Sequence, residues 1–184
     1  MAEKQKTGRA ELYSLLLLAG GKSSRMGEDK AELLLDGDSF LSCQIKKAEK
    51  LGIHKVYVSV HAAGADAFRN GTVKSSIHIQ MVPDIYRERG PLGGLHACMK
   101  AMDTPYCLVL PVDVPQFPEE TLEELLLAHE NSLGAAASEN AGSFGNGREG
   151  GNSGKPLLLV HGERTEPLMG IYPVCMADCI GEQI

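Results

Sequence analysis

Two glycines followed by three positively charged side chains form the part of this sequence best suited to binding phosphate groups. Gly20 and Gly21 come directly after the apolar run Leu15–Leu18. Three cations then follow within nine residues, at Lys22, Arg25 and Lys30. Glycines let a backbone turn its N–H groups toward an anion, and lysine and arginine neutralise phosphate charge. This segment therefore predicts a loop that holds a triphosphate.

The same segment departs from two common nucleotide-binding patterns. It lacks the Gly-x-x-x-x-Gly-Lys-Ser/Thr pattern of P-loop proteins, and it lacks the Gly-x-Gly-x-x-Gly pattern of dinucleotide-binding folds. A plain glycine-rich connection is the alternative interpretation. The apolar run before the glycines and the spaced cations after them favour phosphate binding.

One aspartate is placed to hold a metal ion. Asp113 stands just beyond the apolar stretch Tyr106–Pro111, which reads as a buried strand. Open α/β sheets bind their ligands at the carboxyl ends of such strands. Mg²⁺ binds through one or two carboxylates together with substrate phosphates, so Asp113 suits it. The alternative is an aspartate that caps a turn before Pro115.

A second group of candidate residues follows the stretch Ile77–Val82. Asp84 could contact a ligand or form an Asx turn after Pro83. The segment Gly90–Leu95 is rich in glycine, so its backbone could come close to a ligand. The helix that it begins offers N–H groups to an anion. A tight strand–helix turn is its alternative interpretation. Arg87 and Arg89 could meet an acceptor phosphate or could be solvated surface residues.

Composition limits the classes of protein to which this chain can belong. Its 184 residues, 43% apolar and 23% charged, fit one domain over residues 1–184. The net charge of −6 argues against a nucleic-acid partner. No apolar run is long enough to span a membrane, so no membrane partner is expected. The five cysteines form no Cys-x-x-Cys pair, so we expect buried, reduced thiols in a cytoplasmic protein.

The charge is divided unevenly along the chain. Residues 1–100 carry 15 Lys/Arg against 11 Asp/Glu, whereas residues 101–184 carry 3 against 13. The positive half contains the glycine-rich segment, which fits phosphate binding. The negative half contains Asp113 and a run of glutamates typical of a solvated helix face.

Alternating strand-like and helix-like stretches predict an α/β fold with helices on the faces of a sheet. Strands are expected at Leu15–Leu18, Lys55–Val60, Ile77–Val82, Tyr106–Pro111, Gly134–Ala137, Pro156–Val160 and Leu168–Tyr172. Helices are expected from Ser39 to Leu51 and at Ala62–Arg69, Gly94–Met102, Glu119–Glu130 and Val174–Ile180. Residues 1–11 are expected to be a flexible tail and residues 140–154 a flexible, glycine-rich insertion.

Three blocks in this order resemble the MobA-like nucleotidyltransferases. They are Leu18-Ala-Gly-Gly-x-Ser-x-Arg-Met-Gly-x-Asp-Lys30, Gly90-Pro-Leu-Gly-Gly-Leu95 and Asp113-Val-Pro115. The resemblance extends from about Tyr13 to Tyr172. It implies a three-layer, Rossmann-like fold of the nucleotide-diphospho-sugar-transferase type, with a mostly parallel central sheet.

The resemblance also implies roles for individual residues. Nucleotide binding is implied for Leu18, Ala19, Gly20, Gly21, Lys30, Asp84 and Asp113. Catalytic roles in charge stabilisation are implied for Arg25, Lys30 and Asp113, and Asp113 is implied as the ligand of the cofactor Mg²⁺. Where the family often has an asparagine near the base or ribose, this chain has Ser59.

The activity implied by the resemblance is transfer of GMP from GTP to the terminal phosphate of molybdopterin or molybdenum-molybdopterin. Other molybdenum cofactor biosynthesis proteins are further partners to consider. Use of CTP or of another acceptor phosphate stays open, as does a non-catalytic protein that binds nucleotide or molybdopterin. Family members usually continue past the strand that matches Leu168–Tyr172, so we expect the C-terminal part of the family domain to be missing here.

Overall fold

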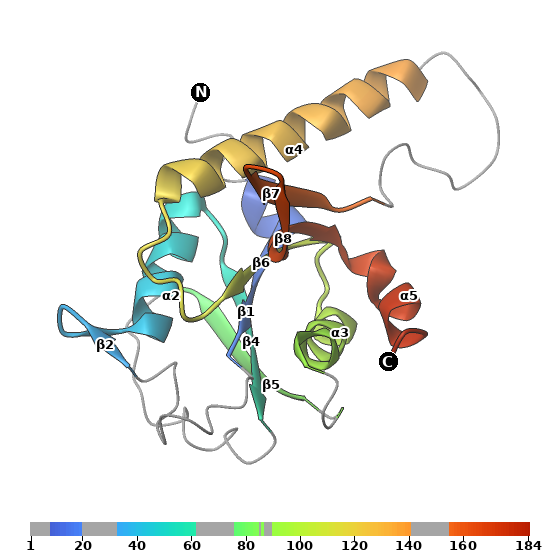
Figure 1. The fold of residues 1–184 in the computed structure, drawn as a ribbon. Coiled ribbons are helices and arrows are strands. Elements are labelled where there is room, and N and C mark those ends of the chain that lie inside the picture. Colours follow the sequence, from blue (N-terminus) through green and yellow to red (C-terminus); the bar gives the residue numbers. More distant parts are fainter. Residues whose placement is uncertain (1–7, 20–32, 62–75, 85, 87–89, 141–154) are drawn as a thin grey trace.

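Six strands form the central sheet of the computed structural model, which describes residues 8–19, 33–61, 76–84, 86, 90–140 and 155–184 (Figure 1). In spatial order they are β5 (His78–Asp84), β4 (Lys55–His61), β1 (Tyr13–Leu18), β6 (Tyr106–Pro111), β8 (Arg164–Pro173) and β7 (Leu157–His161). The first four run parallel, and β8 and β7 pair antiparallel to their neighbours. The predicted α/β fold with a mainly parallel sheet is confirmed.

Strand β1 lies in the middle of the parallel part of the sheet. All six of its residues are buried, as expected for a strand covered by helices on both faces. Leu15 is paired with Val56 of β4 on one side and with Leu108 of β6 on the other. The continuous apolar run in the sequence therefore marks the central strand of the parallel part of the sheet.

Helices cover both faces of the sheet and give three layers (Figure 1). One apolar cluster joins the sheet to α2 (Phe40–Leu51) and α4 (Glu119–Asn140). The other joins it to α3 (Pro91–Ala101) and to α5 (Ala177–Gly181), which follows the 3₁₀ turn η2 (Val174–Met176). No described helix combines the length and apolar composition that a membrane crossing needs.

Helix α2 begins where the sequence predicts. The Ser39 hydroxyl accepts a hydrogen bond from the Ser42 N–H at 3.1 Å, which caps the helix. Gly52 ends it in the left-handed conformation, with φ of 78°. The expected apolar face is buried and consists of Leu41, Ile45, Ala48 and Leu51. A small hairpin of β2 (Leu34–Leu35) and β3 (Asp38–Ser39) leads into the helix.

One predicted strand does not form, and the predicted start of one helix is wrong. Helix α4 continues to Asn140, so the short strand expected at Gly134–Ala137 does not form. Its three successive alanines favour helix, and open space surrounds Gly134. Helix α3 begins at Pro91 rather than at Gly94, because proline is well tolerated in the first helical turn. The helix expected at Ala62–Arg69 lies outside the described residues.

The start of the described chain is ordered by an ion-pair cluster. Residues 8–12 are helical, and the Arg9 side chain is only 1% exposed. Its guanidinium lies 2.8 Å from the Glu123 carboxylate and 2.6 Å from that of Glu130, both on α4. The expected flexible tail over residues 1–11 is therefore wrong for residues 8–11. Residues 1–7 and 141–154 lie outside the described residues.

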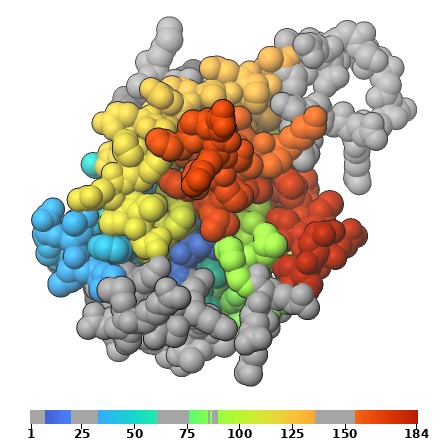
Figure 2. All heavy atoms as spheres, in the orientation of Figure 1, coloured from blue at the N-terminus to red at the C-terminus, as the bar shows by residue number. Residues whose placement is uncertain are grey.

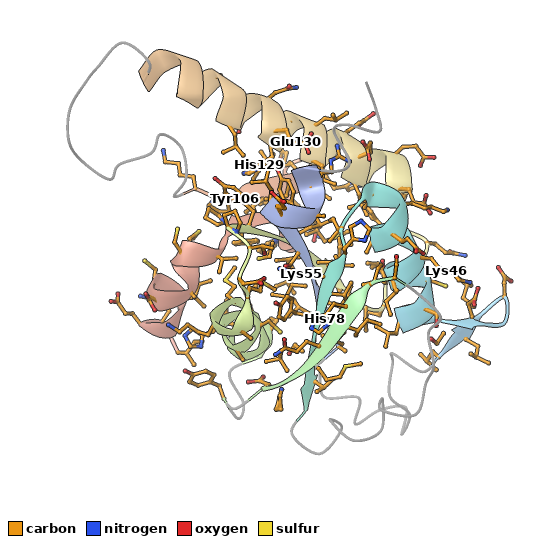
Figure 3. The ribbon with its side chains drawn as sticks, turned by 180° about the vertical axis from the view of Figure 1, so that it is seen from behind. Lys46, Lys55, His78, Tyr106, His129 and Glu130 are labelled. Carbon is orange, nitrogen blue, oxygen red and sulfur yellow. The ribbon has the colours of Figure 1, made fainter. Side chains whose placement is uncertain are left out.

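A buried polar cluster joins α4 to the amino ends of β1 and β6. The Tyr13 hydroxyl lies 2.8 Å from His129 Nδ1, and the Tyr106 ring centroid lies 4.5 Å from that of His129. Figure 3 shows Tyr106, His129 and Glu130 side by side. His129 is 4% exposed. Burial lowers the pKa of His129, and the charge of neighbouring Glu130 only partly opposes this. The imidazole is thus kept neutral in the folded protein.

Acidification is expected to destabilise the fold through His129. Because its pKa lies below the ordinary value of 6.5, the unfolded chain takes up the proton first. The free energy of unfolding should therefore fall as pH drops below about 6.5, by at most about 1.4 kcal/mol per pH unit for one group. Urea unfolding between pH 7.5 and 5 measures this.

The variant His129→Gln keeps a hydrogen-bond acceptor for Tyr13 and should flatten that pH dependence. His78→Gln, at an exposed position on β5, is the matched control and should retain it. An unchanged pH slope in His129→Gln would show that His129 does not cause the acid sensitivity.

Candidate functional site

The ends of three parallel strands are tied together at the carboxyl edge of the sheet. The Ala19 N–H donates to the Ser59 carbonyl at 3.1 Å, which joins the end of β1 to β4. The Val112 N–H donates to the Leu18 carbonyl at 3.1 Å, which joins β1 to the segment after β6. Leu18, Ala19 and Asp113 are therefore brought to one edge, as the sequence predicts.

Helix α3 begins in very close contact with this edge. A Cβ added to Gly94 would lie 2.1 Å from Ser59 Oγ, and a Cβ added to Gly93 would lie 2.7 Å from Asp84 Oδ1. Only glycine allows such an approach without a shift of the backbone or of these side chains. Gly93 and Gly94 thus serve tight strand–helix packing, the alternative that the sequence leaves open.

Asp84 forms the turn after β5. Its Oδ1 accepts a hydrogen bond from the Tyr86 N–H at 2.9 Å, which is an Asx turn. The same carboxylate faces the first turn of α3 at Gly93. A structural role for Asp84 is therefore observed, and its contact with a nucleotide stays a prediction.

Asp113 is exposed at the beginning of the loop between β6 and α4. A cavity of about 470 Å³ lies beside it. Its lining combines Asp113 with the rest of that loop, from Val114 to Pro118, and with Leu35 and Phe40. In Figure 2 the end of β1 (blue) is visible between the yellow atoms of this loop and α4 and the green atoms of α3.

Two polar side chains of α2, neither of them a predicted site residue, hold the Asp113 loop through hydrogen bonds. Gln44 Nε2 donates to the carbonyls of Pro111 and Val114, and Lys47 Nζ donates to those of Pro115 and Phe117. Burial lowers the pKa of Lys47. In the sequence both are polar residues beside the apolar positions of an amphipathic helix, three positions apart, but that pattern does not show what they contact.

The remaining predicted site residues lie outside the described residues. They are Gly20, Gly21, Arg25 and Lys30, and the arginines Arg87 and Arg89 lie outside as well. The described chain ends at Ala19 before the glycine-rich segment and resumes at Leu33, one residue before β2.

The chemistry of the Asp113 carboxylate fits a magnesium ion. Within the described ranges, no group of three or more His, Cys, Asp or Glu side chains could hold a metal ion. Mg²⁺ needs only one or two carboxylates when substrate phosphates and water complete its shell. An exposed carboxylate at the end of a central strand meets that requirement.

Residues 15–180 match the family described as the MobA-like NTP transferase domain. The chain belongs to this family. The match contains most of β1, the Asp113 loop and helices of both layers, so the carboxyl edge described above belongs to a MobA-like domain.

Curated relatives of this MobA-like chain carry one recurring name. A "Molybdenum cofactor guanylyltransferase" of Rhizobium johnstonii is 30% identical over 169 residues, covering 88% of this chain. One of Pseudomonas fluorescens is 32% identical over 165 residues, covering 89% of this chain. The chain spans about two thirds of their length, 64% of the first and 68% of the second.

Solved structures share the fold. Molybdopterin-guanine dinucleotide biosynthesis protein A from Archaeoglobus fulgidus superposes with a TM-score of 0.60 at 21% identity, covering 93% of this chain and 72% of that one. The 4-diphosphocytidyl-2C-methyl-D-erythritol synthase of Anaerococcus prevotii gives 0.59 at 11% identity, covering 97% and 77%. The three-layer, Rossmann-like architecture expected from the sequence is thereby confirmed.

Substitution of Gly94 by alanine should destabilise the domain. The new Cβ would overlap Ser59 Oγ, and relief of such overpacking typically costs about 1–3 kcal/mol of unfolding free energy. Adding Ser59→Ala should recover part of this loss, since it removes the overlapping oxygen. A double-mutant cycle measured by urea unfolding gives the coupling between the two positions.

Gly134→Ala is the matched control, because nothing lies within 4 Å of its added Cβ. It should stabilise α4 by up to about 1 kcal/mol through helix propensity. Equal tolerance of Gly94→Ala and Gly134→Ala would contradict the close approach of α3 to β4.

Proposed function

We propose that this chain transfers GMP from GTP to the terminal phosphate of molybdenum-molybdopterin and releases pyrophosphate, which makes the molybdopterin guanine dinucleotide. The observation that carries the proposal is the position of Asp113, exposed at the carboxyl edge beside the end of β1. It occurs in a MobA-like domain whose curated relatives are named guanylyltransferases.

The proposed reaction exchanges one phosphorus–oxygen bond for another. An oxygen of the molybdopterin phosphate forms a bond to the α-phosphorus of GTP. The bond from that phosphorus to the bridging oxygen of the β-phosphate breaks, and pyrophosphate leaves with the electron pair. Because the attacking phosphate is already anionic, no general base is required, and catalysis consists of positioning and charge stabilisation.

Each site residue has a defined part in this proposal. Nucleotide contacts come from the backbone around Leu18, Ala19, Gly20 and Gly21, and from Asp84 beside α3. Arg25 and Lys30 neutralise the negative charge that grows on the departing pyrophosphate. Asp113 would hold Mg²⁺, which when bound neutralises the triphosphate and orients it.

The proposal extends to partners and location. GTP and molybdopterin, with or without molybdenum, are the substrates, and other proteins of molybdenum cofactor biosynthesis supply the acceptor and take up the product. No disulfide joins the five cysteines, all of which lie within the described residues, and this fits a reducing cytoplasm. The prediction that they are buried is wrong for Cys175 and Cys179, which are exposed.

Removal of the Asp113 carboxylate should abolish most turnover. We expect Asp113→Ala and Lys30→Ala each to lower the rate of guanine dinucleotide formation by about 10²–10³-fold, the usual effect of losing one electrostatic stabiliser. The measurement incubates the protein with labelled GTP, molybdopterin and Mg²⁺, and follows both products.

Asp103→Ala is the control for Asp113→Ala. Asp103 is an exposed aspartate in the turn before β6, where it pairs with Lys55 at 2.6 Å, so its loss should leave turnover unchanged. Full Mg²⁺-dependent activity of Asp113→Ala would overturn the assignment of the metal ligand. GTP binding without pyrophosphate release from the unaltered chain would indicate a nucleotide carrier instead of an enzyme.

Nucleotide choice should be visible as stabilisation by the preferred substrate. A ligand present at one hundred times its Kd adds about 2.7 kcal/mol to the free energy of unfolding. We expect GTP with Mg²⁺ to raise Tm more than CTP, ATP or UTP at equal concentration. A larger shift with CTP would redirect the proposal to a cytidylyltransferase.

A further inference from the structure

Helix α2 places two buried polar side chains against the loop that carries Asp113. Gln44 is fully buried and Lys47 is 7% exposed. Gln44 Nε2 lies 3.3 Å from the Pro111 carbonyl oxygen and 3.2 Å from that of Val114. Lys47 Nζ lies 2.5 Å from the Pro115 carbonyl oxygen and 2.7 Å from that of Phe117. Two side chains thus bind four carbonyls on both sides of Asp113.

This loop depends on outside donors because of its composition. Prolines at 111, 115 and 118 supply no N–H groups, so the segment cannot satisfy its carbonyls by a regular backbone ladder. One internal bond joins the Phe117 N–H to the Val114 carbonyl at 3.1 Å. The side chains of α2 therefore complete the hydrogen bonding that fixes the shape of the loop.

Lys47 differs in its surroundings from the lysines beside it. Lys46 is 57% exposed and pairs with the Asp38 carboxylate, and Lys50 is 64% exposed and pairs with that of Glu119. Lys47 instead lies in the interior and donates to neutral carbonyls. Burial of this ammonium group costs free energy, and its hydrogen bonds to the two loop carbonyls offset that cost. The side chain of Lys47 is therefore matched to the carbonyls of the Asp113 loop.

The same helix is connected to the segment expected to bind phosphate. The Phe40 N–H donates to the Leu33 carbonyl at 2.9 Å, which ties the first turn of α2 to the chain that follows residues 20–32. Ser39 caps this end. Phe40 also lines the cavity beside Asp113. Helix α2 therefore contacts two segments. Its first turn is hydrogen-bonded to Leu33, just after the glycine-rich segment, and its buried polar side chains are hydrogen-bonded to the Asp113 loop.

We propose that Gln44 and Lys47 are positioning residues for nucleotidyl transfer, holding the loop so that the Asp113 carboxylate faces the magnesium-bound triphosphate. This inference rests on the function proposed above. Neither residue touches substrate in this scheme. Their loss should weaken the use of Mg²⁺ and slow turnover, while binding of GTP without Mg²⁺ should stay the same.

The test replaces each donor by an apolar side chain of similar size, in Lys47→Met and Gln44→Leu. Lys50→Met, one turn further along α2 and exposed, is the matched control. We expect the Mg²⁺ concentration for half-maximal turnover to rise about tenfold in each of the first two variants, in line with the loss of hydrogen bonds from a charged or buried donor. The Kd for GTP in EDTA should change less than twofold.

Hydrogen exchange of the metal-free protein gives a readout that does not depend on activity. The amides of Val112, Asp113 and Val114 should exchange about tenfold faster in Lys47→Met and Gln44→Leu, and at the original rate in Lys50→Met. If Lys47→Met does not fold, Gln44→Leu alone carries the test. Loop exchange and Mg²⁺ dependence equal to those of Lys50→Met would overturn the positioning role.

The two proposals fail in distinguishable ways. An unaltered chain that forms no guanine dinucleotide overturns the proposed function, and the exchange rates of the loop still decide whether Gln44 and Lys47 hold it. Variants that lose Mg²⁺-independent GTP binding together with turnover would show a general structural role instead of positioning.

Discussion

The position of Asp113 at the edge of the sheet depends on one buried strand, β1, whose end is hydrogen-bonded to the chain on both sides. β1 is covered on both faces. At its end, the Ala19 N–H donates to the Ser59 carbonyl on one side, and the Leu18 carbonyl accepts from the Val112 N–H on the other. These bonds fix where the three neighbouring strands, β4, β1 and β6, end relative to one another. The edge on which Asp113 stands is thus defined by backbone geometry before any polar side chain contributes.

The sequence predicted the elements whose pattern reflects local physics. The apolar runs of β1 and β6 and the serine cap of α2 are found as expected, because burial on two faces and end capping leave clear signals. The prediction was wrong at Gly134–Ala137, where a short strand was expected and α4 continues instead. The solvent-exposed helix accepts Gly134, since its surroundings are open.

The position of Asp113 was predicted because its motif lies at a strand end, where a short sequence block determines the geometry. Asp113 reaches the expected edge for this reason. Gln44 and Lys47 were missed, because their partners are backbone carbonyls about seventy residues away along the chain. Such partners leave no mark in sequence spacing, and only the packing of α2 against the sheet makes them neighbours.

The contact between Gly94 and Ser59 limits which side chains position 59 can carry. Ser59 is 1% exposed beneath the first turns of α3, so its hydroxyl is enclosed by protein. A larger side chain at position 59 would push this helix away from the sheet. Because position 94 is already glycine, such a side chain can be accommodated only by a shift or tilt of α3.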